Sequence, residues 1–322
     1  MGRRRIAASA LALLAGCIVA TAGHAAPARD GAATVAETAE APALRDRLRE
    51  RMAERRRGAR QEPTDRLVIA GHKVDLWRPG SEQTSKAPLI QFSHGFHGCA
   101  TQSTFLMAAL ARHGYVAAAP DHADASCAAG AATGLREPPE QKFRDAKAWS
   151  EATYRQRADD LKAVLDGLKA DAHWSGLIDW SGLGLAGHSL GGHTVLGAAG
   201  AWPSWRLAGV KAVLALSPYC APFADHGDLA HLGVPTMYQG GTRDVGITPF
   251  IKRPGGCYDK TAAPAYFVEL SRAGHLAWTD LRPEHQDRIV AYALAFFDKY
   301  VAGMDGEGLG AKRDDVTELR SK

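Results

Sequence analysis

The sequence predicts an α/β fold, with a mainly parallel central sheet and helices on both faces. From residue 66 onward, short apolar segments alternate with longer stretches of helical spacing. This alternation is typical of βαβ units, whose strands run parallel. The 322 residues are 46% hydrophobic and 23% charged, which are ordinary values for a globular protein. No repeat of about 20–50 residues is present, so a solenoid or propeller is not expected.

The elements follow one another along residues 66–302, which we expect to form one catalytic domain. The segments with strand character are residues 67–69, 73–78, 89–92, 115–119, 183–186, 212–216, 234–238 and 266–270. The segments with helical spacing are residues 104–113, 147–168, 192–200 and 284–300. Residues 123–142 are small and polar, and predict a surface excursion. Only residues 217–233 separate two of the strands, so no large cap insertion is expected there.

The N-terminus predicts a signal peptide over residues 1–26. Three arginines at residues 3–5 precede an apolar run over residues 6–22, and small residues follow. This order is that of a secretory leader, with cleavage near Ala25 or Ala26. We therefore expect an exported protein, periplasmic or secreted. Residues 14–17 (Leu-Ala-Gly-Cys) look like a bacterial lipobox, so a lipoprotein anchored at Cys17 stays open as an alternative.

The formal net charge of +4 lies outside the predicted domain. The leader carries three Arg and no acid, and residues 27–65, an Arg- and Ala-rich tether, carry nine basic and eight acidic residues. Residues 66–322, which end in a polar C-terminal tail over 303–322, carry 27 of each sign. Because the domain has no excess positive charge, no nucleic-acid partner is expected. We expect membrane contact only through the leader or a lipid on Cys17.

Four cysteines remain beyond Cys17, and an even number in an exported chain predicts disulfides. Cys99 and Cys127 follow two neighbouring predicted strands, and Cys220 and Cys257 follow the next two strands beyond residue 189. We therefore predict the pairs Cys99–Cys127 and Cys220–Cys257. No C-x₂-C spacing is present, so a zinc site is not favoured.

Residues 187–191 (Gly-His-Ser-Leu-Gly) match G-x-S-x-G. An apolar strand runs directly into the motif and a helix of small residues leaves it. This strand–turn–helix context is typical of a nucleophile elbow, in which flanking glycines permit a tight turn that presents the serine hydroxyl. Ser189 is therefore the predicted nucleophile.

A serine nucleophile needs a general base that a third group orients. Asp244 follows the end of the strand at residues 234–238, and His275 lies in a glycine-preceded loop after the last strand. The chain order Ser189, Asp244, His275 is the one that accompanies a nucleophile elbow. We therefore predict these three as the catalytic residues.

The predicted oxyanion hole consists of two backbone N–H groups, which would stabilise a tetrahedral intermediate. One belongs to Leu190, directly after the nucleophile. The other belongs to Phe96, in the glycine-containing loop after the strand at residues 89–92. The residues expected to form the substrate pocket are Phe96, Trp202, Tyr219 and Trp278.

A metal site is an alternative for the same region. His94, His97, Asp121, His122 and Asp124 follow two neighbouring strands, and histidine and carboxylate side chains are metal ligands. Their order differs from that of metallo-β-lactamase-type sites, and the serine machinery is complete without a metal. We therefore expect no metal and no organic cofactor.

Together these motifs resemble the α/β-hydrolase superfamily, and within it the branch of dienelactone hydrolase-like, chlorophyllase-like and platelet-activating-factor-acetylhydrolase-like esterases. The matching stretches are residues 92–96, 114–122, 157–166, 187–192, 241–244 and 273–275. The resemblance covers residues 66–302. It implies the α/β-hydrolase fold and hydrolysis of carboxylic esters through an acyl-enzyme.

The predicted function is therefore that of an exported serine esterase acting on small to medium acyl esters, in the form of small molecules, lipids or polymers. A thioesterase or amidase with the same triad is the nearest alternative. A metal-dependent hydrolase and a catalytically silent envelope protein are further alternatives.

Overall fold

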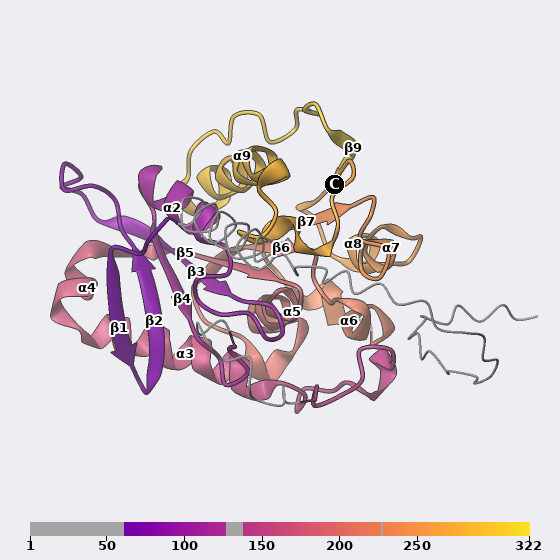
Figure 1. Ribbon diagram of the computed structural model, residues 1–322, viewed down its shortest axis with the longest axis horizontal. Helices are drawn as coiled ribbons and strands as arrows, with labels where there is room; N and C mark the ends of the chain where they lie inside the picture. The colour runs from indigo at the N-terminus through magenta and orange to yellow at the C-terminus, as the bar shows by residue number, and fades with distance from the viewer. Residues whose placement is uncertain (1–60, 127–137, 227) are drawn as a thin grey trace, which may run out of the picture. The chain divides into compact units, whose positions relative to one another are not determined.

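The computed structural model describes residues 61–126, 138–226 and 228–322. Within them, nine strands form one sheet in the order β1-β2-β4-β3-β5-β6-β7-β8-β9 (Figure 1). The strands are β1 (Asp65–Ile69), β2 (His72–Trp77), β3 (Ala87–Ser93), β4 (Val116–Pro120), β5 (Ile178–His188), β6 (Val210–Leu216), β7 (Thr236–Gly241), β8 (Ala265–Leu270) and β9 (Val316–Ser321). Strands β3 to β8 are parallel, whereas β1, β2 and β9 join antiparallel. The predicted α/β class with a mainly parallel sheet is confirmed.

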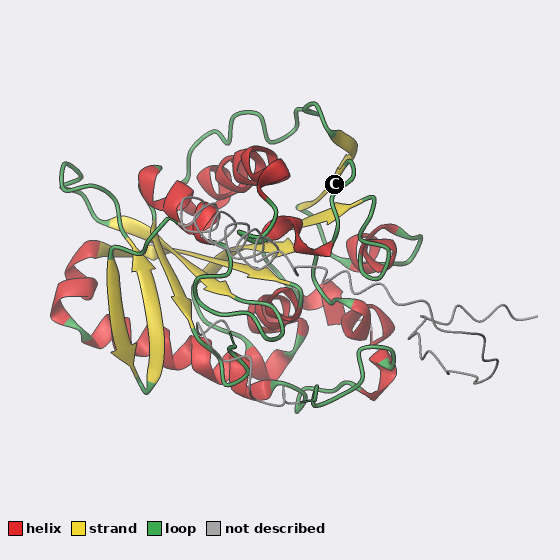
Figure 2. Ribbon diagram, viewed as in Figure 1, coloured by secondary structure: helices red, strands yellow, loops and turns green. Residues whose placement is uncertain are grey.

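Helices cover both faces of this sheet (Figure 2). The α-helices are α2 (Thr104–Arg112), α3 (Arg155–Ala170), α4 (Ala172–Leu177), α5 (Leu190–Leu196), α6 (Ala221–His226), α7 (Thr248–Lys252), α8 (Cys257–Lys260) and α9 (Gln286–Phe297). Short 3-10 turns are η1 (Ala146–Ala148), η3 (Pro203–Trp205), η4 (Asp228–His231), η5 (His275–Trp278) and η6 (Pro283–His285), and π turns are η2 (Gly197–Ala201) and η7 (Asp298–Ala302). Between β6 and β7 lie only α6 and η4, so the described residues contain no large cap at that point.

Alternating side chains of the central strands divide the core into two clusters. On β6, Val213 and Ala215 pack with α3 and α5, whereas Leu214 and Leu216 pack with α2 and α9. All four are fully buried. This period-2 alternation within continuous apolar strands is what a parallel sheet covered on both faces requires.

The long helix α3 begins later than the sequence spacing suggests. Tyr154 lies in the left-handed region at φ 59°, and its backbone N–H donates to Glu140 Oε2 at 2.6 Å. A helix starting at residue 147 would require a right-handed backbone at this position. The predicted start at residue 147 is therefore wrong, and α3 starts at Arg155.

The C-terminal segment contributes to the sheet. Strand β9 pairs antiparallel with β8, from Tyr266↔Ser321 to Leu270↔Val316. The domain boundary predicted at residue 302 is therefore too early. The strand β9 is mostly polar, but its first residue, Val316, packs in the core. At the other end, Gln61 already contacts the fold through Thr104 and Trp77.

A disulfide joins Cys220, just before α6, to Cys257, the first residue of α8. It therefore ties the loop after β6 to the segment after β7. The predicted pairing Cys220–Cys257 is confirmed. The other predicted pair, Cys99–Cys127, stays a prediction because Cys127 lies outside the described residues. The predicted leader with Cys17 and most of the predicted tether also lie outside them.

In the parts of the chain that the structure covers, no helix has both the length and the apolar character needed to cross a membrane.

Removing the disulfide should destabilise the domain. The loop that Cys220 and Cys257 close spans a sequence separation of 37, and constraining such a loop stabilises a protein by about 2–4 kcal/mol. Cys220→Ala and the double variant Cys220→Ala/Cys257→Ala should lower the free energy of unfolding by similar amounts in urea titrations without reductant. Unchanged midpoints in both variants would contradict this contribution.

Candidate active site

The turn at Ser189 places a serine at the carboxyl end of the central strand β5. Ser189 has φ 56° and ψ −116°, a backbone conformation that non-glycine residues rarely adopt. Its two flanking glycines are required by space: a Cβ on Gly187 would lie 2.3 Å from Gly191 O, and a Cβ on Gly191 would lie 1.9 Å from Ser93 O. The strained turn is held by hydrogen bonds from Ser189 N to Leu216 O and from Tyr219 N to Ser189 O.

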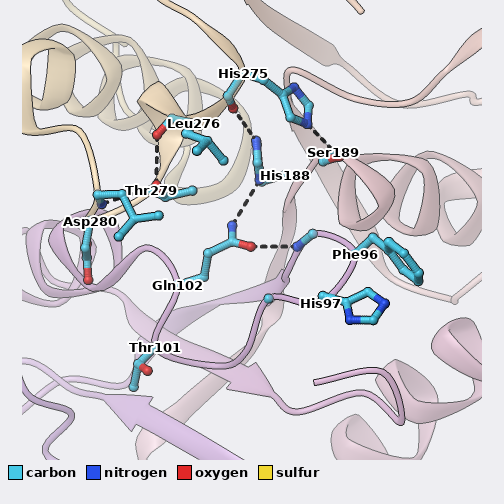
Figure 3. A pocket seen from close by; sticks show the side chains of 13 residues that line it. Phe96, His97, Thr101, Gln102, His188, Ser189, His275, Leu276, Thr279 and Asp280 are labelled. Atoms are coloured by element: carbon cyan, nitrogen blue, oxygen red, sulfur yellow. Dashed lines mark hydrogen bonds between the residues drawn. The ribbon is translucent and has the colours of Figure 1, made fainter. Parts of the chain in front are cut away.

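The structure brings Ser189, His275 and Asp244 together. His275 Nε2 lies 2.9 Å from Ser189 Oγ (Figure 3). On the other side of the ring, His275 Nδ1 lies 3.3 Å from Asp244 Oδ1. Asp244 is 3% exposed, whereas Ser189 and His275 are partly exposed. This arrangement can activate the serine hydroxyl, because the base touches the hydroxyl and the carboxylate orients the base.

Ser217, which was not among the predicted site residues, contacts both Asp244 and His275. It follows β6 directly, and its hydroxyl donates to Asp244 Oδ2. Ser217 Oγ also lies 2.8 Å from His275 Nδ1. Thr248 Oγ1 also donates to Asp244, at 3.3 Å. The Asp244 carboxylate is therefore fixed by two hydroxyl donors besides the imidazole.

A cavity of about 330 Å³ opens beside the serine. Its lining comes from three segments that meet at the carboxyl edge of the sheet: residues 95–102, residues 188–189 and residues 275–281. Figure 3 shows Phe96 and His97 on one side of Ser189 and Leu276 on the other. The volume is at the lower end of the range for ligand pockets, which is about 300–1,000 Å³.

A hydrogen-bond chain connects the loop after β3 to the loop that carries His275 (Figure 3). Gly95 N donates to Gln102 Oε1 at 2.9 Å, Gln102 Nε2 lies 3.1 Å from His188 Nδ1, and His188 Nε2 lies 2.8 Å from His275 O. Because a carbonyl oxygen only accepts, His188 Nε2 carries the proton and Nδ1 accepts from Gln102. Burial lowers the pKa of His188 to about 3. This imidazole therefore stays neutral, with one donor at Nε2 and one acceptor at Nδ1.

This chain fixes the predicted oxyanion loop against the nucleophile. A Cβ on Gly95 would lie 3.4 Å from Ser189 Cβ, so the loop backbone passes close to the elbow. Phe96 follows in the same loop and lines the cavity. Leu190, the other predicted donor, is the first residue of α5, where a backbone N–H has no partner within the helix.

Below this loop lies a buried arginine. Arg157 is fully buried, and its guanidinium donates to His94 O at 2.7 Å and to Gly95 O at 3.3 Å. Its charge is balanced by Asp124, at 2.8 Å, and this pairing lowers the pKa of Asp124 against the opposing effect of burial. His94 adds a bond from Nδ1 to Gly95 O at 2.7 Å. These contacts hold the carbonyl groups of His94 and Gly95, and the N–H group of His97 donates to Asp124 Oδ2 at 3.0 Å.

A second Ser–His–Asp arrangement lies in the same buried region. Ser93 Oγ lies 2.9 Å from His122 Nε2, and His122 Nδ1 lies 2.8 Å from Asp160 Oδ2. Ser93 is 0% exposed and does not line the cavity, in contrast to Ser189. Its hydroxyl therefore has no access to a substrate, and we assign this second arrangement to the packing of β3 and β4 on α3.

The predicted pocket residues are only partly placed at the cavity. Phe96 lines it, whereas Trp202, Tyr219 and Trp278 do not. Trp278 is 0% exposed and donates to Gln239, and Trp202 packs in the core against His193. Tyr219 packs on Trp149 and donates to Phe143 O. The prediction for these three is wrong, because large aromatic side chains near the site contribute more by burial in the core than by exposure at its rim.

The side chains of the metal alternative are engaged elsewhere. His94 Nε2 accepts from His122 N at 3.0 Å, and Asp121 Oδ1 accepts from Ala100 N at 2.7 Å. Asp124 pairs with Arg157. No group of three or more His, Cys, Asp or Glu side chains among residues 61–126, 138–226 and 228–322 is arranged to hold a metal ion.

Sequence reasoning missed Gln102 and Ser217 because each acts through a contact between segments far apart in the chain. Gln102 contacts His188, 86 residues away, and Ser217 contacts Asp244 and His275. Ser217 had a local signal, since it directly follows a predicted strand. Gln102 had none, as polar side chains are common in loops.

Comparison with protein families found a match over part of the chain. A family model described as platelet-activating factor acetylhydrolase, isoform II, matches residues 75–165. This family lies in the α/β-hydrolase superfamily, and the sheet and helices described above agree with that assignment. The chain has the α/β-hydrolase fold. The matched residues run from β2 into α3, so they include the oxyanion loop but not Ser189, Asp244 or His275. A search of curated proteins found no match.

Four histidines should stay neutral well below neutral pH in this α/β-hydrolase domain. Burial lowers the pKa of His94, His188 and His193 to about 3 and that of His122 well below its usual value. The unfolded chain takes up protons on these residues near pH 6.5, so stability should fall as the pH drops from about 6.5 toward 3. The loss is about 1.4 kcal/mol per pH unit for each histidine.

Asp160 acts in the opposite direction, because burial raises its pKa to about 6. Urea unfolding between pH 7.5 and 5 measures the net slope. His193 donates to Tyr219 O and accepts from Trp202, and a glutamine can replace both bonds. His193→Gln should therefore lower the proton uptake on unfolding by about one proton. An equal slope in both proteins would show that His193 protonates in the folded state.

Proposed function

We propose that this protein is an exported serine hydrolase that cleaves carboxylic esters through Ser189, His275 and Asp244. The observation that carries the proposal is the 2.9 Å contact between His275 Nε2 and Ser189 Oγ at the wall of a 330 Å³ cavity. Similarity to an α/β-hydrolase family over residues 75–165 supports a hydrolytic reaction. The size of the cavity favours small to medium acyl groups.

In the proposed first step, Ser189 Oγ attacks the ester carbonyl carbon while its proton passes to His275 Nε2. Asp244 and Ser217 hold the ring and Asp244 stabilises the imidazolium. The carbonyl oxygen becomes an oxyanion, and the backbone N–H groups of Phe96 and Leu190 donate to it. Contacts from Arg157 and Gln102 hold the Phe96 loop in place, so these two are positioning residues.

The tetrahedral intermediate then collapses. The bond to the leaving alcohol breaks, and the alcohol oxygen takes the proton from His275, which leaves an acyl-enzyme on Ser189. A water molecule attacks the acyl carbon while His275 again accepts a proton. The bond between the acyl carbon and Ser189 Oγ then breaks, Oγ takes the proton from His275 Nε2, and the carboxylic acid leaves. No metal ion or organic cofactor takes part in these steps.

Export is part of the proposal. The Cys220–Cys257 disulfide supports an oxidising compartment, and the predicted leader over residues 1–26 supports the periplasm or the exterior as the location. A lipid anchor on Cys17 is the alternative location for the same enzyme.

A thioesterase or amidase would use the same groups. An acetyl ester, thioester and anilide that carry the same substituted phenyl ring separate these activities. We expect kcat/KM to be highest for the ester, which is the substrate class proposed here. A higher kcat/KM for the anilide or the thioester would replace the esterase assignment.

Exchanging each of the two serines tests the assignment. Ser189→Ala should lower kcat for p-nitrophenyl acetate by at least about a thousand-fold, because the nucleophile is lost. Ser93→Ala is the matched control: it breaks the other Ser–His–Asp arrangement and should keep kcat within about five-fold of wild type. It should instead lower the free energy of unfolding by about 1–3 kcal/mol, because a buried imidazole loses its donor.

Circular dichroism spectra and urea midpoints should be measured to check that both variants fold. An active Ser189→Ala protein, or an inactive but folded Ser93→Ala protein, would contradict the assignment.

A further inference from the structure

A second cavity, of about 640 Å³, adjoins the first on the far side of His275. The two cavities share His275 and Leu276 as a common wall. Three arginines also line the second cavity: Arg243, beside Asp244; Arg272, in the loop before His275; and Arg282, in the segment after it. We call this cavity the arginine pocket.

The three guanidinium groups are available to a ligand. All three residues are exposed, and no ion pair recorded within the described residues involves any of them. Their backbones are nevertheless fixed: Arg243 N donates to Ala273 O at 2.9 Å, Arg272 N to Thr242 Oγ1 at 2.8 Å and Arg282 N to Thr279 O at 3.2 Å. The loops that carry the three arginines are thus ordered.

Arg272 carries a conformational cost that glycine would avoid. Its φ is 57°, in the left-handed region, which disfavours residues with a Cβ by about 1 kcal/mol. An arginine at such a position, next to two others and beside the catalytic loop, is consistent with a side chain that serves a ligand.

The charge of the pocket favours an anion with one negative charge. Glu284 and Asp315 also line it, so two carboxylates offset two of the three guanidinium charges and leave a net charge of +1. Arginine binds planar carboxylates with two parallel hydrogen bonds. A doubly charged phosphate would meet more repulsion from Glu284 and Asp315 than a carboxylate would.

The position relative to His275 indicates which part of a substrate would reach the pocket. In the proposed reaction His275 gives its proton to the leaving alcohol, so the alcohol portion lies beside this ring. From there the alcohol portion can extend past Leu276, which is 46% exposed, toward the arginines. We propose that the arginine pocket binds a carboxylate on the alcohol portion of the ester, so that the preferred substrates are esters of hydroxy acids, including the acid-terminated ends of oligoesters.

This inference rests on the proposed function but is tested separately from it. Para-acetoxybenzoate carries the carboxylate, para-acetoxybenzamide is its neutral counterpart, and para-acetoxyphenyl phosphate carries a phosphate instead. We expect the wild-type protein to hydrolyse the benzoate with a KM about three- to ten-fold below that of the benzamide, as exposed ion pairs are individually weak. The difference should shrink at high salt.

Arg272→Gln and Arg282→Gln should each remove most of this preference and leave kcat and KM for the benzamide within about two-fold of wild type. Arg66→Gln is the control for the loss of one positive charge, since Arg66 lies on the edge strand β1 and pairs there with Glu62 and Asp75. It should keep the wild-type preference.

Equal KM values for the benzoate and the benzamide, or equal shifts in every arginine variant including Arg66→Gln, would overturn the inference while leaving the esterase assignment intact. A preference for the phosphate ester over the benzoate would replace the carboxylate with a phosphate and so contradict the proposal.

A binding measurement tests the pocket even without turnover. Calorimetric titration of folded Ser189→Ala protein with para-hydroxybenzoate, the product, should show binding that para-hydroxybenzamide lacks and that Arg272→Gln weakens. Absence of this difference would contradict the pocket whether or not any ester is cleaved. If the benzamide ester is also not hydrolysed by the wild type, the proposed function fails independently.

Discussion

The close approach of two backbone segments at Ser189, the elbow after β5 and the end of β3, is the constraint on which the site depends. The elbow at the end of β5 passes so near the end of β3 that Gly191 has no room for a side chain beside Ser93 O. This contact lies beside the strained turn at Ser189 and, at the same time, brings the loop after β3 close to it. The nucleophile and the predicted oxyanion donors are therefore positioned by one and the same packing contact, and any change in the spacing of β3 and β5 would move both.

Buried polar groups hold the surrounding loops in place around this contact. Arg157 holds the carbonyl groups of the loop after β3 from below, and the Gln102–His188 chain links the same loop to the backbone of His275. Neutral imidazoles suit this role because each offers one donor and one acceptor without the cost of a buried charge. The second Ser–His–Asp arrangement shows that connectivity alone does not make a catalytic site, since Ser93 has the partners of a nucleophile but no access to a cavity.

The sequence predicted the fold class, the order of strands β1 to β8 along the chain and the group formed by Ser189, His275 and Asp244. These depend on local signals: period-2 and helical spacing, the glycines of the elbow, and polar residues directly after strand ends. It did not predict the start of α3 or the strand β9, because the first depends on a side-chain contact from Glu140 to Tyr154 and the second on pairing with β8.

The errors at the pocket have a similar cause. Trp202, Tyr219 and Trp278 lie near the site in sequence, but whether an aromatic side chain points into a cavity or into the core is decided by packing across the sheet. Gln102 and Ser217 contact partners far away in the chain, and the arginine pocket is assembled from the segments that follow β7 and β8 together with Asp315, just before β9. None of these arrangements leaves a pattern in consecutive residues.

We propose that Ser189 is the reactive serine of this protein and that Ser93 is not. The most direct test is to treat the native, folded protein with a fluorophosphonate and to locate the adduct by mass spectrometry of its peptides. We expect one adduct, on the peptide that contains Ser189, and its loss in a folded His275→Ala variant. An adduct on Ser93, or no adduct on the native protein, would contradict it.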